Sequence, residues 1–242
     1  MKRIKLNRVE AFPFTSADDL IEYVDKHKGI LVAVNAEKIL HSTPETESII
    51  NGNIGYCDGV GAVKAMHQKG FKDVKKIAGC ELWLKIIAKY YTTKSFYLVG
   101  GKQEVIDETV NKLQKEFESI NIVGYRNGYI KTDEERTSLI SDIARLKPDV
   151  VFVAMGSPKQ ELLMGDMLRV HPAIYQGLGG SFDVYTGHVQ RAPKWWVDHN
   201  IEFAYRLFKE PSRIKRQIHL VKFFWWLLIG KFKKYKKRGA KY

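Results

Sequence analysis

Polar residues follow two apolar runs of the sequence, where a strand would end. Residues 29–34 are apolar and lead to Asn35, and residues 55–57 lead to Asp58 and Gly59. Open parallel sheets bind ligands at the carboxyl ends of their strands, so we treat both positions as candidate site residues. Asp58 could act as a general base, or it could cap a helix in a glycine-rich turn. Asn35 could bind a ligand hydroxyl or cap the helix that follows it.

Two further segments have the residues of a phosphate site. Gly100 and Gly101 separate an apolar run from a helix-like segment, where a helix N-terminus could hold phosphate. The segment is not a P-loop, because Lys102 is not followed by Ser or Thr, and it lacks the full dinucleotide fingerprint. The second segment is Gly156-Ser-Pro-Lys-Gln-Glu161. It predicts a helix with Ser157 as N-cap and Pro158 at the first position, which would place Lys159 and Gln160 beside free backbone N–H groups.

A third polar segment contains Asp183, after a glycine-rich turn, and continues to His188 and Arg191. The sequence has no pair of histidines with metal-ligand spacing, no Asp-x-Asp motif and no Gly-x-Ser-x-Gly motif. We therefore expect neither a catalytic metal held by the protein nor a cofactor.

The pattern between these segments predicts an α/β fold. Apolar runs at 29–34, 95–99, 121–123 and 149–154 indicate strands that are covered on both faces. Helical patterns occupy residues 16–26, 59–69, 79–89, 104–118 and 133–146. Right-handed crossovers between such elements give a doubly wound, Rossmann-like layer with a mainly parallel sheet.

The positive charge is concentrated near the C-terminus. The chain has 242 residues and a net charge of +13, and 11 of its 40 Lys and Arg residues follow residue 212, where Asp and Glu are absent. The rest is nearly neutral, so the composition does not indicate a nucleic-acid-binding body. Two cysteines are too few for a disulfide framework, which fits a reducing compartment. We predict two parts, an α/β body at 1–193 and a helical appendage at 194–242.

The appendage has the composition of a peripheral membrane anchor. Helices are predicted at 194–208 and 211–229, and the second contains seven consecutive apolar residues at 223–229. A spanning helix needs about 20. Aromatic residues flanked by Lys and Arg favour binding at an anionic lipid surface. A core helix followed by a solvated lysine-rich end is the alternative.

Taken together, these segments resemble the WecG/TagA/CpsF family of glycosyltransferases. The matching stretches span residues 31–216 in the family's order and are most specific from 150 to 216. They are Val34-Asn-Ala-Glu37, Asp58-Gly59, Ala78-Gly79-x-Glu-Leu-Trp83, Leu98-Val-Gly-Gly101, Gly156-Ser-Pro-Lys-Gln-Glu161, Gly177-x-Gly-Gly180, Phe182-Asp183, Gly187, Arg191-Ala-Pro193, Tyr205-Arg206 and Glu210-Pro-Ser-Arg213-Ile-Lys-Arg216. Within the family, residues 154–160 and 185–189 are most similar to the branch that makes enterobacterial common antigen.

The resemblance implies an inverting, metal-independent transfer from a UDP-sugar to a polyprenyl-diphosphate-linked N-acetylglucosamine, at the cytoplasmic face of the inner membrane. The sugar of that branch is N-acetylmannosaminuronic acid, and other members use N-acetylmannosaminyl or glucosyl donors. Asp58 matches the proposed base, and Asn35 and Gln160 match residues that orient sugar and diphosphate. The family's tail arginines fall on Arg206, Arg213 and Arg216, which could bind UDP, lipid diphosphate or only phospholipid.

Two departures from the family pattern affect the predicted contacts. Lys76 replaces an Arg before the Ala-Gly pair, and a Lys lacks the planar bidentate contact of an Arg. Ala33 stands where some relatives have Thr. A uronate donor would need a cation, for which Lys159, His188 and Arg191 are the candidates.

The sequence is also compatible with two other classes of protein, and it leaves the oligomeric state open. A nucleic-acid-binding protein would use the basic tail, but no recognised nucleic-acid motif supports it. A nucleotide-binding scaffold would not need Asp58 for its function. Nothing in the sequence decides whether the chain forms a homo-oligomer.

Overall fold

A computed structural model describes residues 1–193, 195–196, 199, 205 and 214–233, and for 214–219 it describes the backbone only. Its centre is a six-stranded sheet in which each pair of neighbours is parallel, in the order β4-β3-β8-β7-β5-β6. The strands are β3 (Gly29–Val34), β4 (Ile54–Cys57), β5 (Ser95–Gly100), β6 (Asn121–Arg126), β7 (Val150–Ala154) and β8 (Ile174–Gly177). All five residues of β7 are buried, as expected for a strand covered on both faces.

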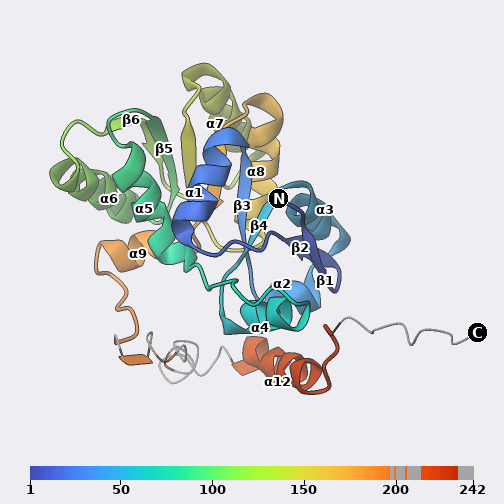
Figure 1. Cartoon of the computed structure of the whole chain (residues 1–242). Coiled ribbons are helices and arrows are strands. Elements are labelled where there is room, and N and C mark those ends of the chain that lie inside the picture. The colour runs from blue at the N-terminus through green and yellow to red at the C-terminus, as the bar shows by residue number, and fades with distance from the viewer. Residues whose placement is uncertain (194, 197–198, 200–204, 206–213, 234–242) are drawn as a thin grey trace, which may run out of the picture.

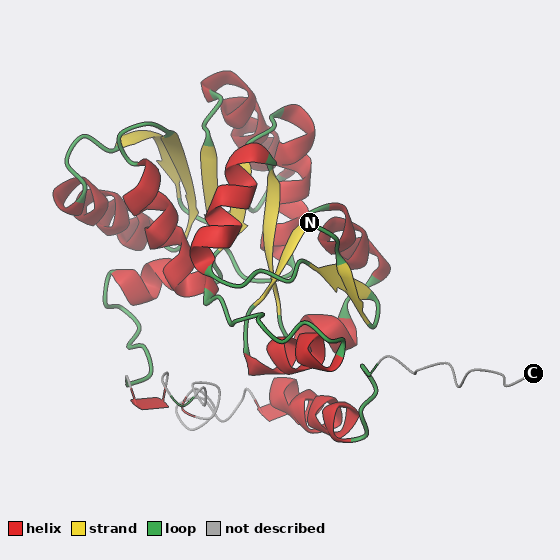
Figure 2. Cartoon of the chain, in the orientation of Figure 1, coloured by secondary structure: helices red, strands yellow, loops and turns green. Residues whose placement is uncertain are grey.

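Helices cover both faces of this sheet (Figures 1 and 2). On one face lie α1 (Ala17–Lys26), α5 (Gly79–Tyr90), α6 (Gln103–Glu116) and the short α9 (Ser181–Tyr185). The other face is covered by α2 (Ala36–His41), α3 (Pro44–Gly52), α4 (Val60–Gln68), α7 (Asp133–Leu146) and α8 (Lys159–Val170). Helix α12 (Ile214–Leu228) joins the same hydrophobic cluster by packing on α2 and α4. The α/β prediction with a parallel sheet and flanking helices is confirmed.

The N-terminus forms a small hairpin that the sequence analysis did not predict. Strands β1 (Ile4–Leu6) and β2 (Val9–Ala11) pair antiparallel around Asn7, whose φ is 63°. The hairpin packs on β4, where a Cβ on Gly55 would lie 2.5 Å from the Glu10 carbonyl oxygen. The absence of a side chain at Gly55 therefore permits this close approach.

Helix α12 lies below the sheet in Figure 1, beside α2 and α4. These two helices follow the carboxyl ends of β3 and β4, so α12 is on the side of the body where ligands are expected. Most of the helix predicted at 194–208 lies outside the described residues. The domain boundary at residue 193 stays a prediction.

The two faces of α12 have different surroundings. Phe223 is 0% exposed and packs against α4, where a Cβ on Gly61 would lie 2.8 Å from its ring. Leu227 is also buried, and its carbonyl accepts a hydrogen bond from Gln68 Nε2 at 2.6 Å. In contrast, Trp225 is 62% exposed and Leu228 is 80% exposed. The apolar run at 223–229 is thus divided between a face that packs on the body and a face that meets solvent. None of the described helices is long and apolar enough to cross a bilayer.

Candidate active site

Asp58 lies directly after β4, at the carboxyl edge of the sheet. Its N–H donates to the Val34 carbonyl at 3.0 Å, which continues the ladder between β3 and β4 by one residue. Gly59 follows with a φ of 104°, a conformation that favours glycine, and α4 begins at Val60. The capping role considered for this turn is not observed, because the N-cap position belongs to Gly59. The Asp58 side chain is half-buried.

The first turn of α5 packs against Asp58. A Cβ on Gly79 would lie 3.5 Å from Asp58 Oδ2 and 2.8 Å from the Tyr56 hydroxyl, so both side chains approach this backbone closely. The preceding segment is tied to β4, because the Ile77 N–H donates to the Cys57 carbonyl at 2.9 Å. The glycine of the Ala78-Gly79 pair is therefore required where α5 meets the candidate base.

Asn35 follows β3, the strand next to β4. Its Oδ1 accepts a hydrogen bond from the Lys38 N–H at 3.0 Å, so it is the N-cap of α2. Its Nδ2 makes no hydrogen bond to the described part of the chain. The capping interpretation is confirmed, and a ligand contact through Nδ2 stays a prediction.

Gln160 is buried at the start of α8 and joins two loops of the carboxyl edge. Its Oε1 accepts from the Gly179 N–H at 2.9 Å, and a Cβ on Gly177 would clash with its amide. The side chain therefore fixes the loop after β8 to the loop after β7. Its predicted contact with sugar or diphosphate is untested.

The prediction that Ser157 caps α8 is wrong. The helix begins at Lys159, Pro158 occupies the N-cap position, and no side chain forms a capping hydrogen bond there. Glu161 does not reach back to Ser157, because its carboxylate pairs with Lys38 Nζ at 3.2 Å. Glu161 is 2% exposed, so this ion pair is a buried link between α8 and α2.

Gly100 and Gly101 are packed against backbone from neighbouring segments. A Cβ on Gly100 would lie 2.3 Å from the Ala154 carbonyl oxygen, and the Gly101 N–H donates to the same oxygen at 3.2 Å. Gly101 in turn accepts a hydrogen bond from the Gly128 N–H at 2.9 Å. Close packing of the chain accounts for both glycines, and their predicted phosphate contact is untested.

Lys76 and Arg191 both lie near Glu81 in the first turn of α5. Lys76 lines a pocket of about 220 Å³ with residues of α1 and α5, Glu81 among them. Arg191 Nη2 donates to Glu81 Oε1 at 2.6 Å. Both cations thus lie near the helix end that approaches Asp58, although Asp58 does not line this pocket.

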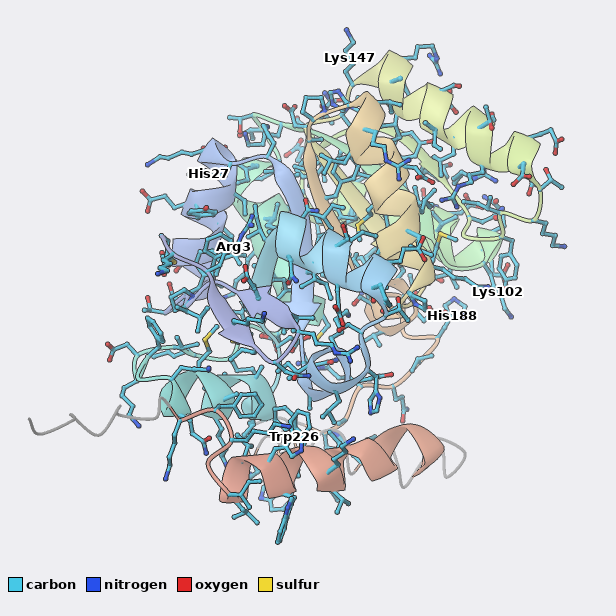
Figure 3. All side chains as sticks on the ribbon, turned by 90° about the vertical axis from the view of Figure 1, so that its right-hand side faces the viewer. Arg3, His27, Lys102, Lys147, His188 and Trp226 are labelled. Carbon is cyan, nitrogen blue, oxygen red and sulfur yellow. The ribbon has the colours of Figure 1, made fainter. Side chains whose placement is uncertain are left out.

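The other predicted residues are more dispersed. Asp183 lies in α9 and is half-buried, and Lys159 is exposed at the start of α8. His188 pairs with Glu108 of α6 at 2.8 Å. It lies apart from Trp226 of α12 (Figure 3). Arg206 and Arg213 lie outside the described residues, and for Arg216 only the backbone in α12 is described.

Three residues of this region were not predicted from the sequence: Tyr56, Gln176 and Lys38. Tyr56 and Gln176 are fully buried beside Gly79, and Lys38 pairs with Glu161. Tyr56 had a recognisable signal, because it lies two positions before Asp58 in a strand and so shares its face. Lys38 and Gln176 had none, since their partners are distant in sequence.

No group of three or more His, Cys, Asp or Glu side chains suited to a metal ion occurs among the described residues. Whether transfer needs a metal is a separate question, and metal independence stays a prediction.

Comparison with known families covers nearly the whole chain. The model of the glycosyl transferase WecG/TagA/CpsF family matches residues 6–237. The match begins at Leu6, the last residue of β1, and includes the complete six-stranded sheet and α12. The chain therefore belongs to the WecG/TagA/CpsF family of glycosyl transferases, which act in cell-surface polysaccharide synthesis.

Proposed function

We propose that this glycosyltransferase moves an N-acetylhexosamine-type sugar, best represented by N-acetylmannosaminuronic acid, from a UDP donor to a polyprenyl-diphosphate-linked N-acetylglucosamine. The transfer inverts the anomeric centre. The observation that carries the proposal is the placement of Asp58 at the carboxyl end of β4, against the first turn of α5 and next to the strand end that holds Asn35.

Asp58 would serve as the general base. Its carboxylate takes the proton of an acceptor hydroxyl while that oxygen attacks the anomeric carbon of the donor. The bond from the anomeric carbon to the UDP oxygen breaks, and UDP leaves with the bonding electron pair. A direct attack from the opposite side inverts the configuration.

Cationic and polar groups near the same edge would bind the two diphosphates. Asn35 and Gln160 orient donor sugar and diphosphate, and Lys76 and Arg191 lie near Glu81 in the first turn of α5. Arg206, Arg213 and Arg216 would neutralise charge on the leaving UDP or bind the lipid diphosphate. A uronate on the donor would pair with Arg191, Lys159 or His188.

The exposed face of α12 would dock the enzyme on the cytoplasmic face of the inner membrane. Val221, Trp225 and Leu228 are exposed apolar side chains on this helix, and the exposed Ile229 follows its last residue. Lys222 on the helix and Lys231 after it are exposed basic side chains. Apolar and basic side chains on one surface are the two signals that hold a peripheral protein on anionic lipid. The lipid-linked acceptor would then reach the carboxyl edge from the side on which α12 lies.

The catalytic proposal is tested by offering purified full-length protein a panel of UDP-sugars with a short-chain polyprenyl-diphosphate N-acetylglucosamine. We expect one product whose mass increases by N-acetylmannosaminuronic acid. A product with N-acetylmannosamine or glucose would assign the chain to another donor class of the family. Absence of any sugar transfer across the panel would contradict the proposal.

The docking proposal is tested by flotation with vesicles of phosphatidylglycerol. Trp225→Ser/Leu228→Ser should reduce the bound fraction strongly, because apolar area that enters the interface is lost. The matched control is Tyr125→Ser/Tyr129→Ser, which removes two exposed aromatic side chains elsewhere on the body and should bind as the unmodified protein does. Equal binding of the two variants, or a preference of the protein for duplex DNA over vesicles, would contradict it.

A further inference from the structure

Three buried groups meet beneath Asp58. Tyr56 of β4 and Gln176 of β8 are both 0% exposed, and Gly79 begins α5. Gln176 Nε2 donates to the Gly79 carbonyl at 3.0 Å, and the Tyr56 hydroxyl lies 2.8 Å from the position that a Cβ on Gly79 would occupy. Two strands and a helix therefore converge at this point from separate parts of the chain.

Two oxygen atoms in this cluster lack a hydrogen-bond partner within the described part of the chain. They are the Tyr56 hydroxyl oxygen and Gln176 Oε1, and both are buried. A buried polar atom without a partner is unfavourable, and such atoms are rare in native proteins. The two atoms are complementary, because a phenolic hydroxyl is a donor whose hydrogen rotates and an amide oxygen accepts only.

Burial keeps Tyr56 in its protonated form. It raises the pKa of Tyr56 well above its ordinary value, the nearby Asp58 carboxylate raises that pKa further, and the Gln176 side chain lowers it. The hydroxyl therefore keeps its hydrogen as a permanent donor, in a place where it is close to both Gln176 and Asp58.

We propose that Tyr56 and Gln176 are positioning residues for glycosyl transfer: Gln176 holds the first turn of α5 against Asp58 through the Gly79 carbonyl, and in the working enzyme the Tyr56 hydroxyl turns to donate to Gln176 Oε1, a hydrogen bond that the structure itself does not contain. This inference rests on the proposed role of Asp58 as the base. We refer to the chain of contacts from Tyr56 through Gln176 to the Gly79 carbonyl as the buried relay.

The location of the relay explains why it would affect the reaction. The same turn of α5 carries Glu81, which binds Arg191, and it forms one side of the pocket that Lys76 lines. A displacement of this turn would therefore move Glu81 and Arg191 together with the backbone that approaches Asp58. Small misplacements of reacting groups lower turnover more than they lower ground-state binding.

The test uses Tyr56→Phe, Gln176→Met and the double variant in the full-length protein. Each single change should lower kcat about tenfold and leave KM for the UDP-sugar within about twofold, because the donor's own contacts remain. Each should also lower Tm, since one buried partner is left alone. The double variant removes both polar partners, so Tm should largely recover while kcat stays low.

The matched control is Tyr175→Phe on the neighbouring β8. Tyr175 is also fully buried, and its hydroxyl donates to the His171 carbonyl at 2.8 Å, outside the relay. Loss of this hydroxyl should lower Tm and leave kcat unchanged. Recovery of kcat together with Tm in the double variant, or an equal loss of kcat in Tyr175→Phe, would overturn the relay.

A measurement without substrate separates this inference from the proposed function. Amide hydrogen exchange of the first turn of α5 should accelerate in both single variants, relative to Tyr175→Phe. Unchanged exchange would show that the relay does not hold this turn. If exchange accelerates but Asp58→Asn is fully active, the relay stands and the proposed base is wrong.

Discussion

The two halves of the carboxyl edge use their residues in different ways. After β5 and β7 the chain approaches itself so closely that Gly100 and Gly101 are packed against Ala154 and the loop at Gly128. After β3 and β4 the strands end in Asn35 and Asp58, with Tyr56 and Gln176 buried below. Glycines after a strand therefore indicate close packing as readily as phosphate binding, whereas polar side chains at the strand ends mark the candidate site.

The largest effect is expected at Asp58. Asp58→Asn keeps the size of the side chain but removes the proton acceptor, so kcat should fall about 10²–10⁴-fold. Binding of the UDP-sugar, measured by calorimetry, and Tm should change little. A kcat within about tenfold of the unmodified enzyme would show that Asp58 is a structural residue. Both halves of the carboxyl edge would then serve packing only.

The next effect concerns the packed half. Gly100→Ala forces a Cβ to within 2.3 Å of the Ala154 carbonyl oxygen at a φ of 141°. Strain and overpacking together should lower the free energy of unfolding by about 3 kcal/mol or more, measured with urea. Gly70→Ala is the control, because its φ is 99° but its Cβ would meet no atom within 4 Å. Equal losses in the two variants would show that backbone strain alone, and not close packing, explains Gly100.

A smaller effect is expected where the two halves are joined. Lys38 follows β3 and Glu161 follows β7, and the side chains of this pair are 16% and 3% exposed. Glu161→Gln leaves Lys38 without its counter-charge, so the free energy of unfolding should fall by about 1–3 kcal/mol.

Glu104→Gln provides the matched control for this pair. Lys102 and Glu104 are 3.9 Å apart with side chains 65% and 62% exposed, and the loss should stay below about 0.5 kcal/mol. If the Glu161 and Glu104 variants are equally stable, Lys38 and Glu161 do not hold the halves together.

The sequence predicted the layers of the fold better than its small elements. Continuous apolar runs predicted β3, β5 and β7, because strands buried on both faces need no polar alternation. The hairpin β1–β2 has three residues in each strand, too few for a period to be recognised. The segment at 157–161 resembled a helix capped by Ser157, but the helix begins two residues later and Pro158, which has no side-chain acceptor, occupies the N-cap position.

The candidate site was predictable only where local signals and strand ends coincide. Asp58 and Asn35 could be identified from the sequence alone, because each is a polar residue directly after an apolar run. Tyr56 and Gln176 could not be paired in advance, because their contact depends on β4, β8 and α5 meeting across the sheet. The tail arginines were identified through the family resemblance, and the geometry of their side chains lies outside the described residues.

The docking of α12 on α4 has a consequence for how the enzyme selects its acceptor. Gly61 at the start of α4 contacts Phe223, Gln68 at its end binds Leu227, and Asp58 precedes Gly61 by three residues. Within the described part of the chain, these contacts join the segment of Asp58 directly to the helix proposed to rest on lipid. The enzyme would then work at a constant height above the bilayer. An acceptor hydroxyl one sugar ring further from the lipid would lie beyond Asp58. The enzyme would therefore select acceptors by the distance of the reacting hydroxyl from the bilayer.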